Sequence, residues 1–202
     1  MLTAAHALFD YEAKWAGRPE SEWKPVTIMF TPGARDRSSP FGSANATSWW
    51  ISMPFFNNED RDRDAGVIRL NRDLAARTGG FASTAEWPNE WTMDVTVYGY
   101  KYSSGNSLPR KISFRAYNTT SWMQTFRGWH QFYSSASVSD SVASVSGGAS
   151  GGPAIARGGA ANGKVVGVFN GIRSSVATNR MRGFRLSSVP LNELRAWVAA
   201  NP

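Results

Sequence analysis

The run Gly148-Ala149-Ser150-Gly151-Gly152-Pro153 is the most specific feature of this sequence. At average frequencies of about 7% for glycine and about 5% for proline, a chance G-x-S-G-G-P has a probability on the order of 10⁻³ or less. A serine nucleophile has to sit on a tight, exposed turn, and glycine allows the backbone conformations that such a turn needs. Glycines also let backbone N–H groups converge where an oxyanion forms. The run therefore predicts acyl-transfer chemistry at Ser150.

A serine hydroxyl is a weak nucleophile, so it needs a neighbouring base, most often a histidine. The chain contains two histidines, His6 and His130. His6 ends the segment LTAAH, whose small residues predict a turn after a hydrophobic strand. His130 lies in no motif, and we assign it to packing or to the surface. His6 is therefore the candidate base.

The base in turn needs a carboxylate that holds its tautomer. Asp64 directly precedes a hydrophobic run at 65–70 and is preferred for that reason. Asp60 and Asp62 lie inside a charge-alternating stretch that we expect to be mostly solvated. The candidates thus follow one another as His, Asp and Ser, which is the order of chymotrypsin-type enzymes and not of subtilisins or α/β-hydrolases.

The elements that position these residues are expected to be strands, because short runs of β-branched and aromatic residues alternate with turn signals. This pattern predicts an antiparallel all-β sandwich or barrel. The expected strands are at 26–30, 47–53, 65–70, 93–100, 111–117, 165–169 and 182–186. Helical periodicity appears only at the end, where Leu191, Leu194 and Val198 follow Pro190. There we expect a short amphipathic helix that lies on the last barrel.

Composition excludes several classes of protein and of site. The chain has 202 residues, of which 42% are hydrophobic, so disorder throughout is excluded. It has no cysteine and two histidines, which excludes disulfides, thiolate metal sites and a three-histidine zinc site. We expect no metal and no cofactor. The net charge of +7 comes without a Lys/Arg block interleaved with aromatics, so we expect no nucleic-acid partner. No apolar run approaches about 18 residues, and no signal peptide is visible, so we expect no membrane span.

Three segments resemble the active-site blocks of the chymotrypsin-like serine peptidases, especially the glutamyl-endopeptidase-like bacterial branch. They are LTAAH at 2–6, DAGVIRLN at 64–71 and GASGGP at 148–153. The runs at 95–100 and 165–171 also look like strands of that branch, the second of them being the strand that pairs with substrate. The resemblance extends from residue 1 to nearly residue 200.

The resemblance implies an all-β fold of two antiparallel Greek-key β-barrels, with the active site in the cleft between them. Because only five residues precede His6, we expect the first barrel to be incomplete. We also expect that the coding sequence continues upstream, past a valine codon taken for a start; an in-frame stop codon just before Met1 would refute this. The expected units are a truncated barrel at 1–82, a linker at 83–92, a second barrel at 93–189 and a helix at 190–200.

The resemblance implies a serine endopeptidase with a polypeptide substrate and an acyl-enzyme intermediate. His6 would be the base, Asp64 its orienter and Ser150 the nucleophile. The N–H groups of Gly148 and Ser150 would form the oxyanion hole. From the family we also expect secretion and a monomer.

Residues that contact substrate are harder to assign. Those that the resemblance implies are Ser144, Phe169, Asn170, Gly171 and Ile172. Phe169 stands where glutamate-specific members carry a histidine that contacts the substrate carboxylate, so glutamate specificity is not expected. Ala149 stands where relatives usually have Asp or Asn before the nucleophile. In many relatives that Asp binds the N-terminal ammonium freed during zymogen activation, and Ala149 cannot do so.

Two other functions remain open on the sequence. One is a catalytically inactive protease-fold binding protein, or an inactive fragment of a protease. The other is a basic β protein that binds nucleic acid, whose affinity would fall steeply with added salt.

Overall fold

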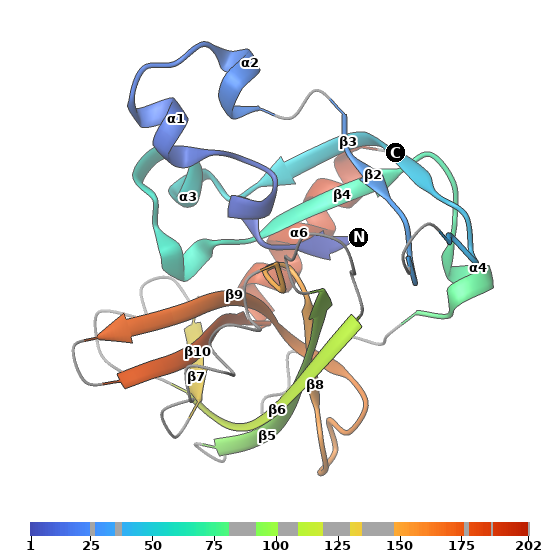
Figure 1. The fold of residues 1–202 in the computed structure, drawn as a ribbon, viewed down its shortest axis with the longest axis vertical. Helices are drawn as coiled ribbons and strands as arrows, with labels where there is room; N and C mark the ends of the chain where they lie inside the picture. The colour runs from blue at the N-terminus through green and yellow to red at the C-terminus, as the bar shows by residue number, and fades with distance from the viewer. Residues whose placement is uncertain are drawn as a thin grey trace.

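The computed structural model describes residues 1–24, 27–34, 38–80, 92–100, 109–118, 130–134, 148–175, 178–186 and 188–201. These residues form an open sheet, a closed barrel and a C-terminal helix, which Figure 1 shows with the barrel below the open sheet.

The open sheet carries the N-terminal part of the chain. Its four antiparallel strands lie in the order β1 (Leu2–Thr3), β4 (Gly66–Leu70), β3 (Ala44–Ile51) and β2 (Met29–Phe30). The two-residue β1 pairs with the start of β4, and Leu2 lies opposite Val67. This pairing brings the segment before His6 next to the segment after Asp64, although the two are far apart in sequence.

Short helical segments follow β1, β3 and β4, and the sequence analysis did not predict them. They are η1 (Ala5–Ala7), α1 (Tyr11–Trp15), α2 (Glu20–Trp23), α3 (Met53–Asn58), η2 (Arg61–Arg63) and α4 (Ala75–Thr78). Asp10 caps α1, since its side chain accepts a hydrogen bond from the N–H of Ala13 at 2.9 Å. The strand expected at 47–53 ends at Ile51, because Pro54 suits the first turn of a helix and interrupts a strand ladder.

The second sheet closes into a barrel with the strand order β10-β7-β6-β5-β8-β9. Its strands are β5 (Thr92–Tyr100), β6 (Pro109–Asn118), β7 (His130–Ser134), β8 (Pro153–Ala156), β9 (Val165–Ser175) and β10 (Thr178–Arg185). The first three are sequential neighbours and β8 returns beside β5, which is Greek-key connectivity. This confirms the predicted fold class: an all-β protein with a complete second barrel, an incomplete first one and a C-terminal helix.

The barrel core contains hydrophobic side chains of β5 and β7. Val95, Val97 and Phe132 are essentially inaccessible to solvent and pack in one cluster. Thr96 is also buried, and its hydroxyl hydrogen-bonds the hydroxyl of Ser113 at 2.8 Å, so that neither polar group is left without a partner.

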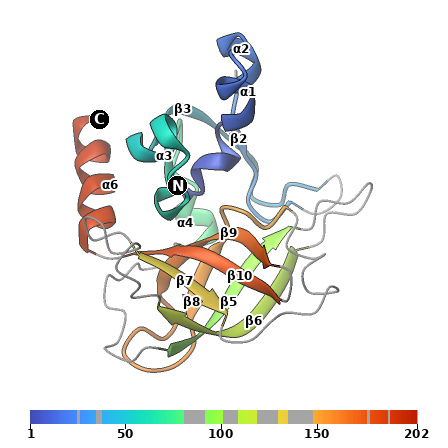
Figure 2. The same cartoon turned by 90° about the vertical axis from the view of Figure 1, so that its left-hand side faces the viewer.

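The C-terminal helix α6 (Ser188–Ala200) differs from the prediction in the face that it buries. Leu191 and Leu194 are buried as expected, but Val198 is 50% exposed and Trp197 packs inward instead. The reason is that α6 does not lie on the barrel alone. Its cluster includes Val67 of the open sheet together with barrel residues, so the helix bridges both sheets, as Figure 2 shows.

The expected linker at 83–92 lies outside the described residues, except for Thr92, which begins β5. The division of the chain at 82/83, 92/93 and 189/190 therefore stays a prediction.

Candidate active site

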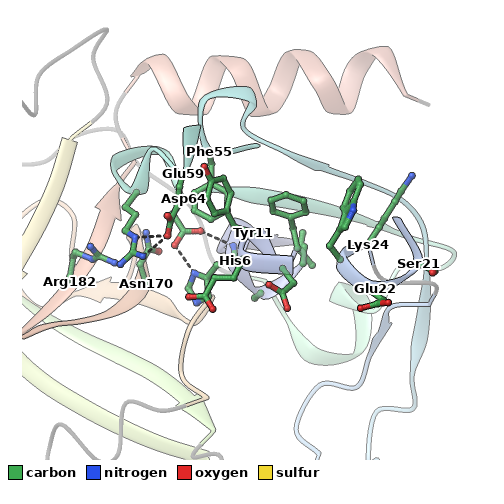
Figure 3. Close-up of a pocket in the computed structure, with 17 residues that line it drawn as sticks. His6, Tyr11, Ser21, Glu22, Lys24, Phe55, Glu59, Asp64, Asn170 and Arg182 are labelled. Atoms are coloured by element: carbon green, nitrogen blue, oxygen red, sulfur yellow. Dashed lines mark hydrogen bonds and ion pairs between the residues drawn. The ribbon is translucent and has the colours of Figure 1, made fainter. Parts of the chain in front are cut away.

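His6 and Asp64 lie together at the end of the open sheet nearest the barrel. Nδ1 of His6 is 2.6 Å from Oδ2 of Asp64, and the backbone N–H of His6 donates to Oδ1 at 2.9 Å. The Asp64 side chain is only 3% exposed, whereas that of His6 is 36% exposed. The carboxylate is thus anchored, and the ring extends from it towards solvent (Figure 3).

This geometry decides the tautomer of the histidine. An ionised carboxylate can only accept hydrogen bonds, so the proton of the neutral ring lies on Nδ1. Nε2 then has a free lone pair and is the atom that can accept a proton. The pair therefore has the chemistry of a general base, His6, whose ring is oriented by the carboxylate of Asp64.

The position of Asp64 is set by Ser52, which is 1% exposed. The Ser52 hydroxyl donates to the carbonyl oxygen of Arg63, and its N–H donates to the carbonyl of Ala65 at 3.0 Å. One buried residue thus holds the backbone on both sides of Asp64, through its hydroxyl on one side and its backbone N–H on the other. Asp60, by contrast, is ion-paired with Arg63 at 3.5 Å. The structure therefore places Asp64, not Asp60, against the histidine.

The glycine run around Ser150 forms a tight turn at the edge of the barrel. The N–H of Gly152 donates to the carbonyl of Ala149 at 2.9 Å, and Gly151 has φ of 86°. A positive φ at the third residue of such a turn favours glycine. A Cβ at Gly152 would overlap the carbonyl oxygen of Tyr98, so this position also requires glycine.

The turn is fastened to the barrel on two sides. Ala149 is buried in the barrel core, and a Cβ at Gly99 would lie 2.6 Å from it. The N–H of Gly151 donates to the carbonyl of Phe169 at 2.8 Å, while the N–H of Phe169 donates to Gly152 at 2.9 Å. Ser150 is therefore carried by a turn whose neighbours are all fixed.

The serine turn lies against the segment that leads to His6. A Cβ at Gly151 would overlap the Thr3 hydroxyl and lie 3.3 Å from the backbone nitrogen of Ala4. Across the described part of the chain, Ser150 and His6 make no hydrogen bond to each other. The structure thus brings the two turns together and shows the His–Asp half of the constellation hydrogen-bonded.

The backbone N–H of Ser150 donates to no acceptor among the residues the structure describes. Gly148 has φ of 88°, which is the conformation expected where successive N–H groups are turned to one side. Gly148 is exposed and Ser150 is partly exposed, and the role of their N–H groups as an oxyanion hole stays a prediction. Within the same described ranges, no group of three His, Asp or Glu side chains could hold a metal ion.

A sequence model of the family described as Trypsin matches residues 2–198. The chain belongs to the trypsin family. Membership supports a serine protease that acts on polypeptides. Separately, none of the helices in the described ranges is long and apolar enough to span a membrane.

Solved serine protease structures share the trypsin-family fold of this chain. A Glu endopeptidase in complex with MPD has a TM-score of 0.70 at 17% identity, over 98% of this chain and 80% of that one. Protease Anisep from Arthrobacter nicotinovorans has a TM-score of 0.65 at 19% identity, with 95% and 79% covered. The thermostable serine protease AL20 from an extremophilic microorganism has 0.65 at 18% identity, with 95% and 80% covered. No curated protein matches the chain.

The residues expected to contact substrate in this trypsin-family chain have different surroundings. Phe169 has no exposed surface and packs in the same core cluster as Ala149, while its backbone is hydrogen-bonded to Gly151 and Gly152 of the serine turn. Asn170 is 4% exposed and lines a cavity together with His6 and Asp64. Gly171 lies in β9 opposite Arg182. Ile172 also lies in β9, and Ser144 lies outside the described residues.

Sequence reasoning missed a cavity of about 700 Å³ beside His6. Its walls come from the segment 6–12, from α2 and from the α3–η2 region, with Asn170 and Arg182 on the barrel side (Figure 3). The one signal in the sequence was the density of aromatic and charged residues at 9–24, which has no counterpart in the three motif blocks.

Proposed function

We propose that this chain is a serine endopeptidase that hydrolyses peptide bonds through an acyl-enzyme intermediate. The observation that carries the proposal is the 2.6 Å hydrogen bond between His6 and the buried Asp64, beside the turn that bears Ser150. Trypsin-family membership supports the same reaction. Secretion and a monomeric state rest on the family resemblance and stay predictions.

In the first half of the reaction, Oγ of Ser150 attacks the scissile carbonyl carbon and its proton passes to Nε2 of His6. Asp64 holds the ring and stabilises the imidazolium. The N–H groups of Gly148 and Ser150 donate to the oxyanion. His6 then gives its proton to the leaving amine as the C–N bond breaks. In the second half, water attacks the acyl-enzyme by the same route and releases Ser150.

One observation is also compatible with a second candidate, a protease-fold protein that binds polypeptides without cleaving them. In the described residues Ser150 and His6 are not hydrogen-bonded to each other. Catalytic hydrogen bonds are often long in the absence of substrate and shorten when it binds, so this geometry is compatible with both functions.

Labelling with a fluorophosphonate, read by intact mass, separates the two functions. The reagent modifies a serine only when a base activates it and an oxyanion site accepts its phosphoryl oxygen. We expect one adduct on the unmodified chain and none on Ser150→Ala or His6→Ala. His130→Ala is the matched control for the histidine, and Ser39→Ala, an exposed serine, is the control for the nucleophile. Both controls should label fully.

An unmodified chain that takes up no adduct, while its circular dichroism shows a folded β protein, would favour the binding protein. An adduct that survives in Ser150→Ala would place the nucleophile elsewhere. In either case the proposed mechanism would be wrong.

A further inference from the structure

The cavity beside His6 is not used by the proposed bond-breaking steps. It holds about 700 Å³ and is lined on one side by His6 and Asp64. Because the proposed base forms part of its wall, any group that fills the cavity lies close to the bond being cleaved. A side chain of the polypeptide substrate is the natural occupant.

The inner wall of the cavity is aromatic and fixed. Phe9 packs edge-on against Trp23 at 5.5 Å and against Phe55 at 6.3 Å between ring centroids. Tyr11 packs against Phe55 at 6.1 Å and stacks on Trp15 at 5.8 Å, and Trp15 is 73% exposed. Aromatic faces attract cations, and the stack of Tyr11 and Trp15 carries this surface from the cavity to solvent.

The charge of the cavity is opposite to that of the whole protein. The chain has a net charge of +7, yet carboxylates outnumber lysine and arginine side chains in the lining by five to three. The five carboxylates belong to Asp10, Glu12, Glu22, Glu59 and Asp64. A cavity of this charge favours a cationic group over an anionic one.

Partners within the protein already occupy most of these charges. Asp64 binds His6, and Glu59 binds Arg61 at 2.9 Å. Lys24, a cation of the lining, is ion-paired with Glu20 outside it at 2.8 Å.

Glu12 is different. Its carboxylate makes no hydrogen bond or ion pair within the described part of the chain, and the residue is exposed. It stands next to Tyr11 in α1, at the edge of the aromatic wall. The cavity thus combines aromatic walls with one carboxylate that is available to a ligand.

We infer that this cavity binds a lysine or arginine side chain of the polypeptide substrate, close to the cleaved bond, with Glu12 as the carboxylate that pairs with it. The inference rests on the proposed function, because it takes the substrate to be a polypeptide. It assigns a preference opposite to that of an enzyme that selects glutamate.

The test is cleavage of a set of peptides in which lysine, norleucine or glutamate is placed in turn at each position around the cleaved bond. Norleucine matches the lysine stem without the charge. At one position we expect lysine to exceed norleucine in kcat/KM by about fivefold and glutamate to be the poorest of the three. In Glu12→Gln the lysine-to-norleucine ratio should fall below about twofold, and in Glu12→Lys glutamate should become preferred to lysine. The ratio should also fall in 0.5 M salt, which shortens the Debye length to about 4 Å.

Glu193→Gln is the matched control, because it makes the same charge change on an exposed face of α6. It should leave the ratio unchanged. Equal ratios in the unmodified chain and Glu12→Gln, or a preference for glutamate in the unmodified chain, would overturn the inference while leaving the protease itself intact.

Fluorophosphonate labelling of the same preparation tests the proposed function separately. If the unmodified chain takes up no label, binding of fluorescein-labelled lysine and norleucine peptides by anisotropy decides the inference instead. Tighter binding of the lysine peptide that is lost in Glu12→Gln would support the cavity assignment without catalysis, and equal binding would overturn it.

Discussion

Replacing Asp64 by Asn is the sharpest test of the site, because it keeps the shape of the side chain and changes the tautomer of the His6 ring that it stabilises. The amide oxygen of Asn can still accept the N–H of His6, which now donates to Oδ1 at 2.9 Å. The amide nitrogen would face Nδ1, where a carboxylate oxygen now lies at 2.6 Å. A donor at that place requires Nδ1 to accept, so the ring proton moves to Nε2 and the base loses its lone pair.

The expected loss follows from these contacts. A hydrogen bond to a charged group contributes about 1.5–3 kcal/mol, so loss of the bond to the ring alone would lower the rate by about 10- to 150-fold. The wrong tautomer adds to this, and in triads of this type the same replacement lowers kcat by about 10⁴. We therefore expect kcat of Asp64→Asn to fall by about 10³ to 10⁴, with KM changed by less than about threefold.

The assay is steady-state cleavage of a fluorogenic peptide, with the melting temperature measured on the same samples. Asp60→Asn is the matched control from the same loop, since its carboxylate is ion-paired with Arg63 and not with His6. It should keep kcat within about threefold. A folded Asp64→Asn that loses less than tenfold, or an Asp60→Asn that loses as much as Asp64→Asn, would refute the assignment of the orienting acid.

Three further changes test other parts of the site. Gly151→Ala should abolish fluorophosphonate labelling, since a Cβ there overlaps the Thr3 hydroxyl. Gly158→Ala is the control for backbone strain alone, because Gly158 has φ of 100° and a Cβ there would have no atom within 4 Å; this variant should still label. Phe9→Ala, which empties a buried aromatic site, should cost about 3–5 kcal/mol and lower the melting temperature by about 10 °C in thermal unfolding followed by circular dichroism. Because Nε2 of His6 must be unprotonated to act as a base, kcat/KM should fall when the solution is made acidic enough to protonate the ring, which a pH–rate profile measures; a rate that does not fall in acid would contradict a histidine base.

Much of the fold was predictable because its signals are local. Strand alternation depends on neighbours two residues apart, so β4, β5 and β6 were expected near their observed bounds. Only parts of β9 and β10 were expected, since the runs at 165–169 and 182–186 are shorter than the observed Val165–Ser175 and Thr178–Arg185. The helices α1 to α3 were not expected, since each is at most six residues long and too short to show helical periodicity. The buried face of α6 was misjudged at Val198 because it depends on two sheets that come together only in the folded chain.

By itself the sequence determined the turn that carries the proposed nucleophile. The glycines around Ser150 answer a local backbone requirement, a turn with positive φ and no room for side chains, and such a requirement is visible in six consecutive residues. The choice of Asp64 over its neighbours was a preference in the sequence, and the contact that supports it joins residues 58 positions apart.

Only the tertiary structure decided which groups meet and what surrounds them. The buried partner of His6, the hold of Ser52 on the backbone beside Asp64 and the cavity that presents Glu12 all depend on distances between distant segments. Burial and local charge arise when those segments pack, because only then is water excluded around some carboxylates and left at others. A chemical motif can lie within one stretch of chain, whereas the proposed substrate preference depends on a cavity whose walls come from several segments.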